Sequence, residues 1–131
     1  MVRADARFLG WQYWHYTSSF GPKGSTPDPF SGGFGRALVR TYPRATAGWP
    51  MALHYDTTNG DFTYTYATRA SALPTEIYVS DLQYPHGYRV SVRNACALSK
   101  PGDRLLLLRA QPGKKQVDVS LSAGTASWPA C

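Results

Sequence analysis

The clearest pattern in the chain is a pair of runs in which apolar and polar residues alternate. Leu53 and Tyr55 alternate with polar neighbours in the first run, and aromatic residues alternate with threonines over residues 62–66 in the second. The segment that joins the two runs ends in Asn59-Gly60, a pair that tolerates the positive φ of a tight hairpin turn. Because a period of two indicates strands rather than a helix, Met51 to Thr68 is predicted to be a β-hairpin. A lone hairpin is barely stable, so its aromatic face should rest on a second layer.

The second half of the chain supplies candidates for that layer. Alternation predicts strands over residues 75–80, 88–93 and 116–122, and the all-apolar run 105–108 indicates a central strand. With the hairpin these runs make about six strands at the spacing of an antiparallel sandwich. The predicted fold is therefore mainly β, an immunoglobulin-like β-sandwich over residues 36–131.

Two segments of different character precede this sandwich. Residues 1–17 contain the apolar run Phe8-Leu9-Gly10-Trp11, which is typical of a parallel strand buried on both faces. No alternation of strands and helices follows, so this segment is predicted to be a remnant strand cut from something larger. Residues 18–35 are rich in Gly, Pro and Ser and are predicted to be a linker. Apolar spacing then predicts a short helix over residues 34–42, ended by Pro43.

Composition excludes several classes of protein. A chain of 131 residues fits one domain, and nine Tyr and four Trp argue for a folded core. The sequence lacks an apolar run long enough for a membrane helix. Charges within residues 1–7 are unlike a secretory signal, so the compartment stays unassigned. The net charge is +6, but the cations are dispersed, so a nucleic-acid partner is not expected.

The residues that could carry chemistry are sparse. Glu76 is the single Glu, so these residues cannot build a pair of catalytic glutamates. The aspartates are expected to be solvated or to cap turns, and the dispersed histidines predict neither a metal site nor a cofactor. Cys96 and Cys131 could form one disulfide or remain free thiols, and their spacing fits no metal motif.

Trp14 is the exception among these residues. A flat indole at the carboxyl end of a buried strand can pack on a sugar ring, as in barrel enzymes. The alternative is that Trp11 and Trp14 are core residues, and chemistry alone favours that reading.

Several segments together resemble one family. Trp11-Gln12-Tyr13-Trp14, the stretch from Leu38 to Gly48, the strand 62–66 and the run from Pro74 to Val79 are similar to the C-terminal part of endoglycoceramidase-like enzymes of glycoside hydrolase family 5. The similarity runs in order over most of the chain. It implies a (β/α)8 barrel followed by a β-sandwich, with residues 1–17 as the eighth barrel strand. One departure is Thr41, where the family usually has proline.

The resemblance also implies a mechanism. Retaining enzymes of the family use two Glu about 5 Å apart, which would both lie upstream of Met1. Trp14 matches the family's tryptophan beside the sugar that is cleaved, so it is the expected substrate-binding residue. The chain is then expected to be an inactive C-terminal fragment whose intact form cleaves a β-glycosidic bond of a glycolipid. The missing barrel and a glycolipid or carbohydrate would be its partners.

A free-standing carbohydrate- or glycolipid-binding module is the alternative. Such a module would use exposed aromatic residues as a stacking platform. The candidates are Tyr13, Tyr16, Tyr78 and Trp128.

Overall fold

The computed structural model describes residues 2–9, 39–125 and 128–131, which form one short helix and eight strands. In chain order the elements are α1 (Val2–Asp5), β1 (Tyr42–Ala45), β2 (Gly48–Tyr55), β3 (Phe62–Thr68), β4 (Thr75–Tyr78), β5 (Tyr88–Arg93), β6 (Ala95–Ala97), β7 (Leu105–Ala110) and β8 (Gln116–Ala123).

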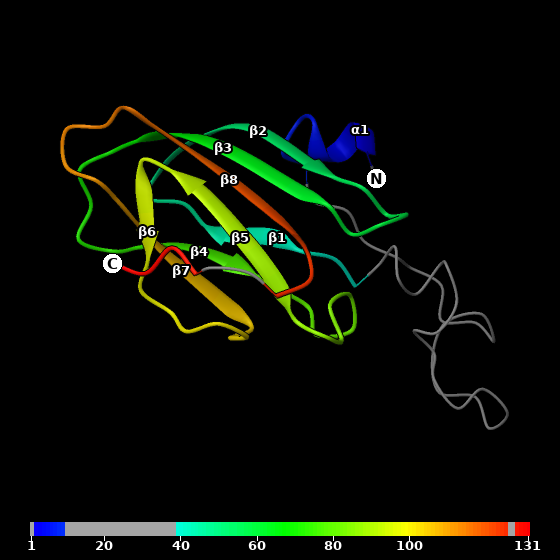
Figure 1. The fold of residues 1–131 in the computed structure, drawn as a ribbon. Coiled ribbons are helices and arrows are strands. Elements are labelled where there is room, and N and C mark those ends of the chain that lie inside the picture. Colours follow the sequence, from blue (N-terminus) through cyan, green and yellow to red (C-terminus); the bar gives the residue numbers. More distant parts are fainter. Residues whose placement is uncertain (1, 10–38, 126–127) are drawn as a thin grey trace, which may run out of the picture.

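The strands make two antiparallel sheets stacked as a sandwich (Figure 1). One sheet has the order β1-β4-β7-β6 and the other the order β2-β3-β8-β5. The consecutive strands β1 and β2 are therefore the edges of the two sheets on one side of the sandwich, and β5 and β6 are the edges on the other side. The mainly β, two-sheet fold predicted from the sequence is confirmed.

The predicted hairpin is confirmed and lies at the centre of the packing. β2 pairs with β3 from Gly48↔Thr68 to Tyr55↔Phe62. Phe62, Tyr64 and Tyr66 of β3 are at most 1% exposed, while Thr63 on the opposite face is exposed. The Tyr64 and Tyr66 rings stack with centroids 5.6 Å apart. The alternation of β3 thus buries its aromatic side chains between the sheets.

The other inward-facing residues complete one core. Its fully or nearly buried aliphatic members are Ile77, Val79, Val90, Leu106, Leu108, Val117, Val119 and Leu121. Burying each such side chain contributes roughly 1.5–3 kcal/mol relative to leaving it exposed. All eight lie in or next to strands that the sequence predicted, so these predictions are also confirmed.

The two strands that the sequence did not predict are β1 and β6. Tyr42, the last residue of the predicted helix over 34–42, instead begins β1 and pairs with Tyr78. That part of the prediction was wrong, and residues 34–38 lie outside the described residues. Pro43 does not end an element, because proline is tolerated in an edge strand, where a missing N–H disturbs no ladder. β6 was missed because three small residues carry no pattern.

The β5/β6 side of the sandwich is closed by the end of the chain (Figure 1). Ala130 makes a parallel bridge with Ala97 of β6, and Cys131 forms a disulfide with Cys96. Trp128 packs edge-on against Tyr88, and its indole N–H donates to the Ser99 carbonyl at 3.0 Å. Of the two states left open for the cysteines, the structure has the disulfide.

The N-terminal segment differs in part from the sequence prediction. Residues 2–5 form α1, which lies beside β2, and Phe8 and Leu9 belong to no strand. Phe8 has a φ of 53° and follows the helix as a left-handed cap, with the Leu9 N–H donating to the Ala4 carbonyl at 2.9 Å. Residues 10–17, the rest of the predicted barrel strand, and the predicted linker 18–35 lie outside the described residues. The division into these domains stays a prediction.

Candidate functional site

An apolar hollow lies at the β1/β2 side of the sandwich. We call it the β1/β2 groove, a cavity of about 740 Å³ bordered by both edge strands and by the segment 5–9. The side chains and backbone that line it are mainly apolar and include Leu9, Tyr42, Pro43, Trp49, Pro50, Leu53 and Tyr78. This size falls within the range of ligand pockets and of interface clefts.

Apolar side chains of this groove are unusually open to solvent. Trp49 is 66% exposed and Tyr42 is 43% exposed, although both are large aromatic residues. Tyr42 packs on Tyr78 across the β1–β4 pair, with ring centroids 5.4 Å apart. Large exposed apolar side chains that border one groove mark an interaction site more often than scattered ones do.

One buried charge lies at the wall of the groove. Arg40 is 5% exposed, pairs with Asp5 at 2.5 Å, and lies over the ring of Tyr55 at 5.2 Å. Its second terminal nitrogen, Nη1, is buried and has no hydrogen-bond partner among the described residues. Burial raises the pKa of Tyr55, with a smaller contribution from Tyr84, so the phenol stays neutral beneath the guanidinium.

Thr41, the residue that departs from the usual proline, is fully buried next to this pair. Its hydroxyl contacts the Tyr84 hydroxyl at 3.4 Å, and Tyr84 donates to the Gly60 carbonyl at 2.5 Å. Through these two contacts, the hairpin turn at Gly60 is linked to Thr41, which lies where the chain enters the sandwich.

Glu76 is the single Glu of the chain. The carboxylate of Glu76 lies 3.8 Å from the Arg44 guanidinium in a partly exposed ion pair. No group of three or more metal-ligating side chains occurs in residues 2–9, 39–125 and 128–131. Among the same residues there is no helix long and apolar enough to cross a membrane.

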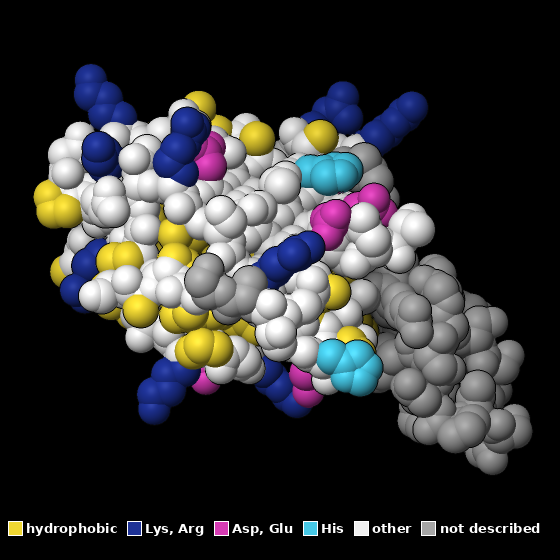
Figure 2. Space-filling view, in the orientation of Figure 1, with side chains coloured by type: hydrophobic (Ala, Val, Ile, Leu, Met, Phe, Trp, Pro, Cys, Tyr) yellow, Lys and Arg dark blue, Asp and Glu magenta, His cyan; other side chains and the backbone are white. Residues whose placement is uncertain are grey.

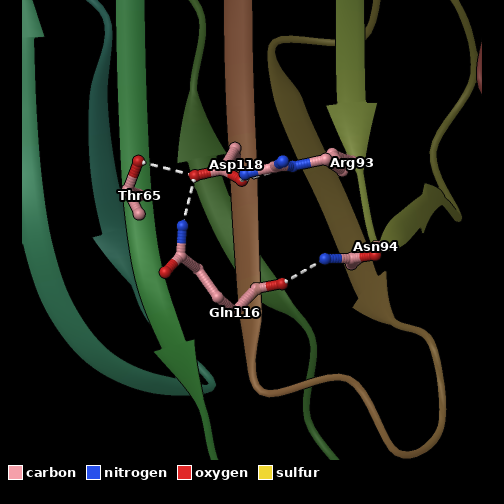
Figure 3. A network of polar contacts seen from close by, with 5 residues as sticks. All are labelled: Thr65, Arg93, Asn94, Gln116 and Asp118. Atoms are coloured by element: carbon pink, nitrogen blue, oxygen red, sulfur yellow. Dashed lines mark hydrogen bonds and ion pairs between the residues drawn. The ribbon is translucent and has the colours of Figure 1, made fainter.

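A second polar cluster lies on the outer face of the β2-β3-β8-β5 sheet (Figure 3). Asp118 of β8 accepts hydrogen bonds from Thr65 at 3.0 Å, from Gln116 at 2.8 Å and from Arg93 at 2.5 Å. These bonds, led by the one from Arg93, lower the pKa of Asp118. Every group in the cluster is paired, and it joins three strands, so we interpret it as a structural network.

Comparison with known proteins decides the family. Residues 40–121, more than half of the chain, match the family model described as the glycoside hydrolase family 5 C-terminal domain. The chain belongs to the glycoside hydrolase family 5 C-terminal domain family. The resemblance inferred from the sequence motifs is thereby confirmed.

Relatives of this C-terminal domain include a curated enzyme. Endoglycoceramidase I of Rhodococcus hoagii (strain 103S) is 48% identical over 122 residues, which are 93% of this chain and 24% of the relative. The chain therefore spans about a quarter of the length of that curated relative.

Solved structures give the same result for this C-terminal domain. Endo-glycoceramidase II from Rhodococcus sp., in its ganglioside GM3 complex, matches with a TM-score of 0.65 and 30% identity over 93% of this chain and 26% of that chain. Sterylglucosidase 1 of Cryptococcus neoformans matches with a TM-score of 0.58 and 23% identity over 68% of this chain and 14% of that chain. The second likeness shows a shared fold alone.

The predicted site residues fall in different places in this family 5 C-terminal domain. Trp14, the expected substrate contact, lies outside the described residues, as do Tyr13 and Tyr16. Tyr78 lies at the β1/β2 groove, whereas Trp128 is part of the closed β5/β6 side. The structure does not bring these two together into a common stacking platform.

The dispersed charge expected from the sequence is visible on the surface. Figure 2 shows Lys and Arg side chains scattered over this face and along its outline, with no continuous basic patch on this face.

Sequence reasoning missed the residues that define the groove. Tyr42 was placed in a predicted helix, Arg40 was noted only as part of the family motif, and Trp49 was given no role. Local alternation carried no signal for them, because Trp49 and Met51 continue the period of two set by Leu53 and Tyr55. The register shift between Pro50 and Ala52, which the sequence did not predict, accompanies their exposure.

Proposed function

We propose that this chain is the C-terminal part of a retaining glycosidase that, in its intact form, cleaves the β-glycosidic bond between the glycan and the ceramide of a glycolipid. The observation that carries the proposal is the 48% identity to endoglycoceramidase I over nearly the whole chain. The match of a domain model over residues 40–121 supports it.

In this proposal the chain does not carry out the reaction by itself. Two carboxyl groups about 5 Å apart are needed, one as nucleophile and one as acid and base. Glu76 is the single Glu of the chain and is held by Arg44, and Asp5 is held by Arg40. The catalytic pair is therefore expected in a (β/α)8 barrel that precedes residues 18–35 in a longer polypeptide.

Trp14 is the substrate-binding residue of the proposal. Its indole would pack on the apolar face of the sugar at the cleaved bond, at the end of the last barrel strand. The disulfide between Cys96 and Cys131 fits an enzyme made for an oxidising compartment.

The test begins with the reading frame upstream of Met1. If it continues as strand-helix repeats, the longer polypeptide and the 131-residue chain are assayed side by side on ganglioside GM3 carrying a fluorescent acyl chain. We expect glycan release by the longer polypeptide and none by the chain. Hydrolysis by the chain alone, or a longer polypeptide that is folded but inactive on glycolipids, would contradict the proposal.

Trp14 is tested in the active polypeptide. Trp14→Ala should lower kcat/KM by at least tenfold, because it removes the ring that positions the sugar, and Trp14→Phe should keep part of the activity. Equal activity of Trp14→Ala and the unchanged enzyme would remove Trp14 from the site.

A further inference from the structure

Residues 128–131 form a strap that lies beside β6 and closes the β5/β6 side of the sandwich (Figure 1). β6 is the edge strand of its sheet, and Ala97 directs its N–H and its carbonyl toward the strap. The Ala97 N–H donates to the Pro129 carbonyl at 2.6 Å, and the Cys131 N–H donates to the Ala97 carbonyl at 3.0 Å. The strap thus covers backbone groups that an edge strand otherwise leaves open.

Few contacts hold this strap apart from the disulfide. Among the residues that the structure describes, they are the two hydrogen bonds to Ala97, the bond from the Trp128 indole to the Ser99 carbonyl, and the packing of Trp128 on Tyr88. Each such hydrogen bond adds little net stability, because an open strap bonds to water instead. Segments with so few contacts open locally without global unfolding. The cross-link from Cys131 to Cys96 is therefore what keeps the strap closed.

The disulfide lies on the outer surface of the sandwich. In β6, Ala95 and Ala97 are buried in the core, whereas Cys96 between them points to the opposite face and is half-buried. Cys131 is exposed. Disulfides that solvent thiols can reach are the ones that exchange readily, in contrast to those sealed in a core.

Arg109 of β7 makes one of the two sulfurs the better leaving group. It is the cross-strand partner of Cys96, so the two side chains lie on the same face of the sheet. Arg109 is exposed, and the ion pairs of the described residues use other arginines. A cation beside a cysteine favours its thiolate, and a more stable thiolate leaves a disulfide faster. Cys96 is therefore the expected leaving group, and Cys131 the sulfur that is attacked.

We propose that the disulfide between Cys96 and Cys131 is an exchange site for low-molecular-weight thiols, and that its reduction opens the 128–131 strap while both sheets stay folded. The β5/β6 side is then complete only when the protein is oxidised. This device does not depend on the glycosidase function, because it uses the described residues of the sandwich alone.

The exchange takes two steps. The thiolate of the first thiol molecule attacks Sγ of Cys131, so a mixed disulfide forms on Cys131 and the Cys96 thiolate leaves. The thiolate of a second molecule attacks the thiol-derived sulfur of that mixed disulfide, which releases the Cys131 thiolate and the small-molecule disulfide. The protein gains two electrons and each thiol molecule loses one. The two incoming thiols give their protons to solvent, and the two cysteine thiolates take up protons from it.

Amide hydrogen exchange of the 131-residue chain, before and after reaction with reduced glutathione, tests the opening. The Ala97 and Cys131 amides should exchange at least tenfold faster in the reduced chain, because their acceptors belong to the strap contact. Leu98 is a matched control, since its N–H donates to the Leu107 carbonyl at 2.8 Å within the sheet. In the reduced chain Leu98 should exchange at least tenfold more slowly than Ala97.

Two results would overturn the proposal. Unchanged exchange of Ala97 after reduction shows that the strap stays closed without its cross-link. Equal exchange of Ala97 and Leu98 in the reduced chain shows that β6 unfolds as a whole, so that reduction loosens the sandwich rather than the strap.

Cys131→Ser supplies the same test without a reductant. Its Ala97 amide should exchange as fast as that of the reduced chain, and glutathione should have no further effect. An Ala97 amide as protected in Cys131→Ser as in the oxidised chain would contradict the proposal.

The site of attack is tested by peptide mass spectrometry after a short reaction with glutathione and an acid quench. The adduct should be on Cys131, and an adduct on Cys96 would contradict the assigned order. Arg109→Gln should slow the reduction several-fold, whereas Arg89→Gln, on β5 of the other sheet, should leave the rate unchanged. Equal rates for these two variants would contradict the role of Arg109.

Discussion

The β1/β2 side and the β5/β6 side of this sandwich have the same chain path but differ in what covers them. At each side the chain passes from one sheet to the other, between β1 and β2 on one side and between β5 and β6 on the other. The β5/β6 side is closed by a disulfide, by a bridge from Ala130 to Ala97, and by Trp128 packed on Tyr88. The β1/β2 side is left with an apolar groove and a 66% exposed Trp49.

The difference teaches that the two tryptophans have different roles. Trp128 has a hydrogen-bond partner and an aromatic neighbour within the chain, so its contribution is to the stability of the sandwich. Trp49 is mostly in solvent, so within this chain it contributes little. A residue that adds nothing to its own fold but forms part of an apolar surface is expected to act on a partner.

The largest change in stability is expected from removing the disulfide on the β5/β6 side. The double substitution Cys96→Ala and Cys131→Ala removes a cross-link between residues 35 apart in sequence. It should lower the free energy of unfolding by roughly 3–4 kcal/mol, mainly by freeing the unfolded chain. Urea denaturation measures this, and reducing agent should destabilise the unchanged chain by a similar amount while leaving the double variant unaffected. A loss below 1 kcal/mol would show that the disulfide does not hold this side.

A smaller effect is expected from the two tryptophans. Trp128→Ala removes a partly buried indole and its bond to Ser99, and should cost about 2–3 kcal/mol. Trp49→Ala, the matched substitution on the open side, should change stability by no more than about 0.5 kcal/mol. Thermal unfolding of both variants of the 131-residue chain measures the contrast. Equal losses of stability for the two variants would contradict the distinction between the β1/β2 side and the β5/β6 side.

Two tyrosines near the hairpin turn give the next contrast. Tyr84→Phe leaves the buried Gly60 carbonyl without its 2.5 Å hydrogen bond and should cost about 1–2 kcal/mol. Tyr55→Phe removes a buried hydroxyl that has no partner among the described residues, so stability should be unchanged or higher. Guanidinium denaturation of the two variants measures this contrast. A larger loss of stability for Tyr55→Phe than for Tyr84→Phe would show that the Tyr55 hydroxyl makes a hydrogen bond that this structure lacks.

The smallest change in stability is expected at Asp118, which lies on the outer face of a sheet and belongs to neither the β1/β2 side nor the β5/β6 side. Its folded pKa lies below its ordinary value of 3.8, so its stabilisation is present above that value and is lost as pH falls through the folded pKa. Asp118→Asn should therefore cost at most about 1 kcal/mol at pH 7, since the pair is partly exposed, and the cost should shrink toward pH 3. Urea midpoints at pH 7, 5 and 3 test this; a cost that does not fall would assign the effect to packing.

Much of the fold could be predicted from local pattern. The strands with a clean period of two, β3, β5 and β8, were placed to within a residue or two because burial on one face imposes alternation. β1 could not be predicted, since its proline and its mostly exposed residues carry no such signal. The disulfide depended on which side β6 joins, which is set by long-range pairing rather than by sequence near Cys96.

The candidate site was less accessible to sequence reasoning than the fold. The β1/β2 groove forms only when two edge strands from different sheets come together, so its residues are not adjacent in any one motif. Trp14 was proposed from a family motif rather than from geometry, and it lies outside the described residues. Arg40 shows what the structure adds, because its burial, and the absence of a partner for its Nη1 among the described residues, cannot be read from its neighbours in sequence.

Under the proposed function, the open side of the sandwich would be covered by another part of a longer polypeptide. The most direct measurement is the cost of Trp49→Ala in two settings, the 131-residue chain and the longer polypeptide, from the same thermal unfolding experiment. We predict a change within about 0.5 kcal/mol in the chain and a loss of at least about 2 kcal/mol in the longer polypeptide, because the indole would be buried there. An equally small change in both settings would contradict it.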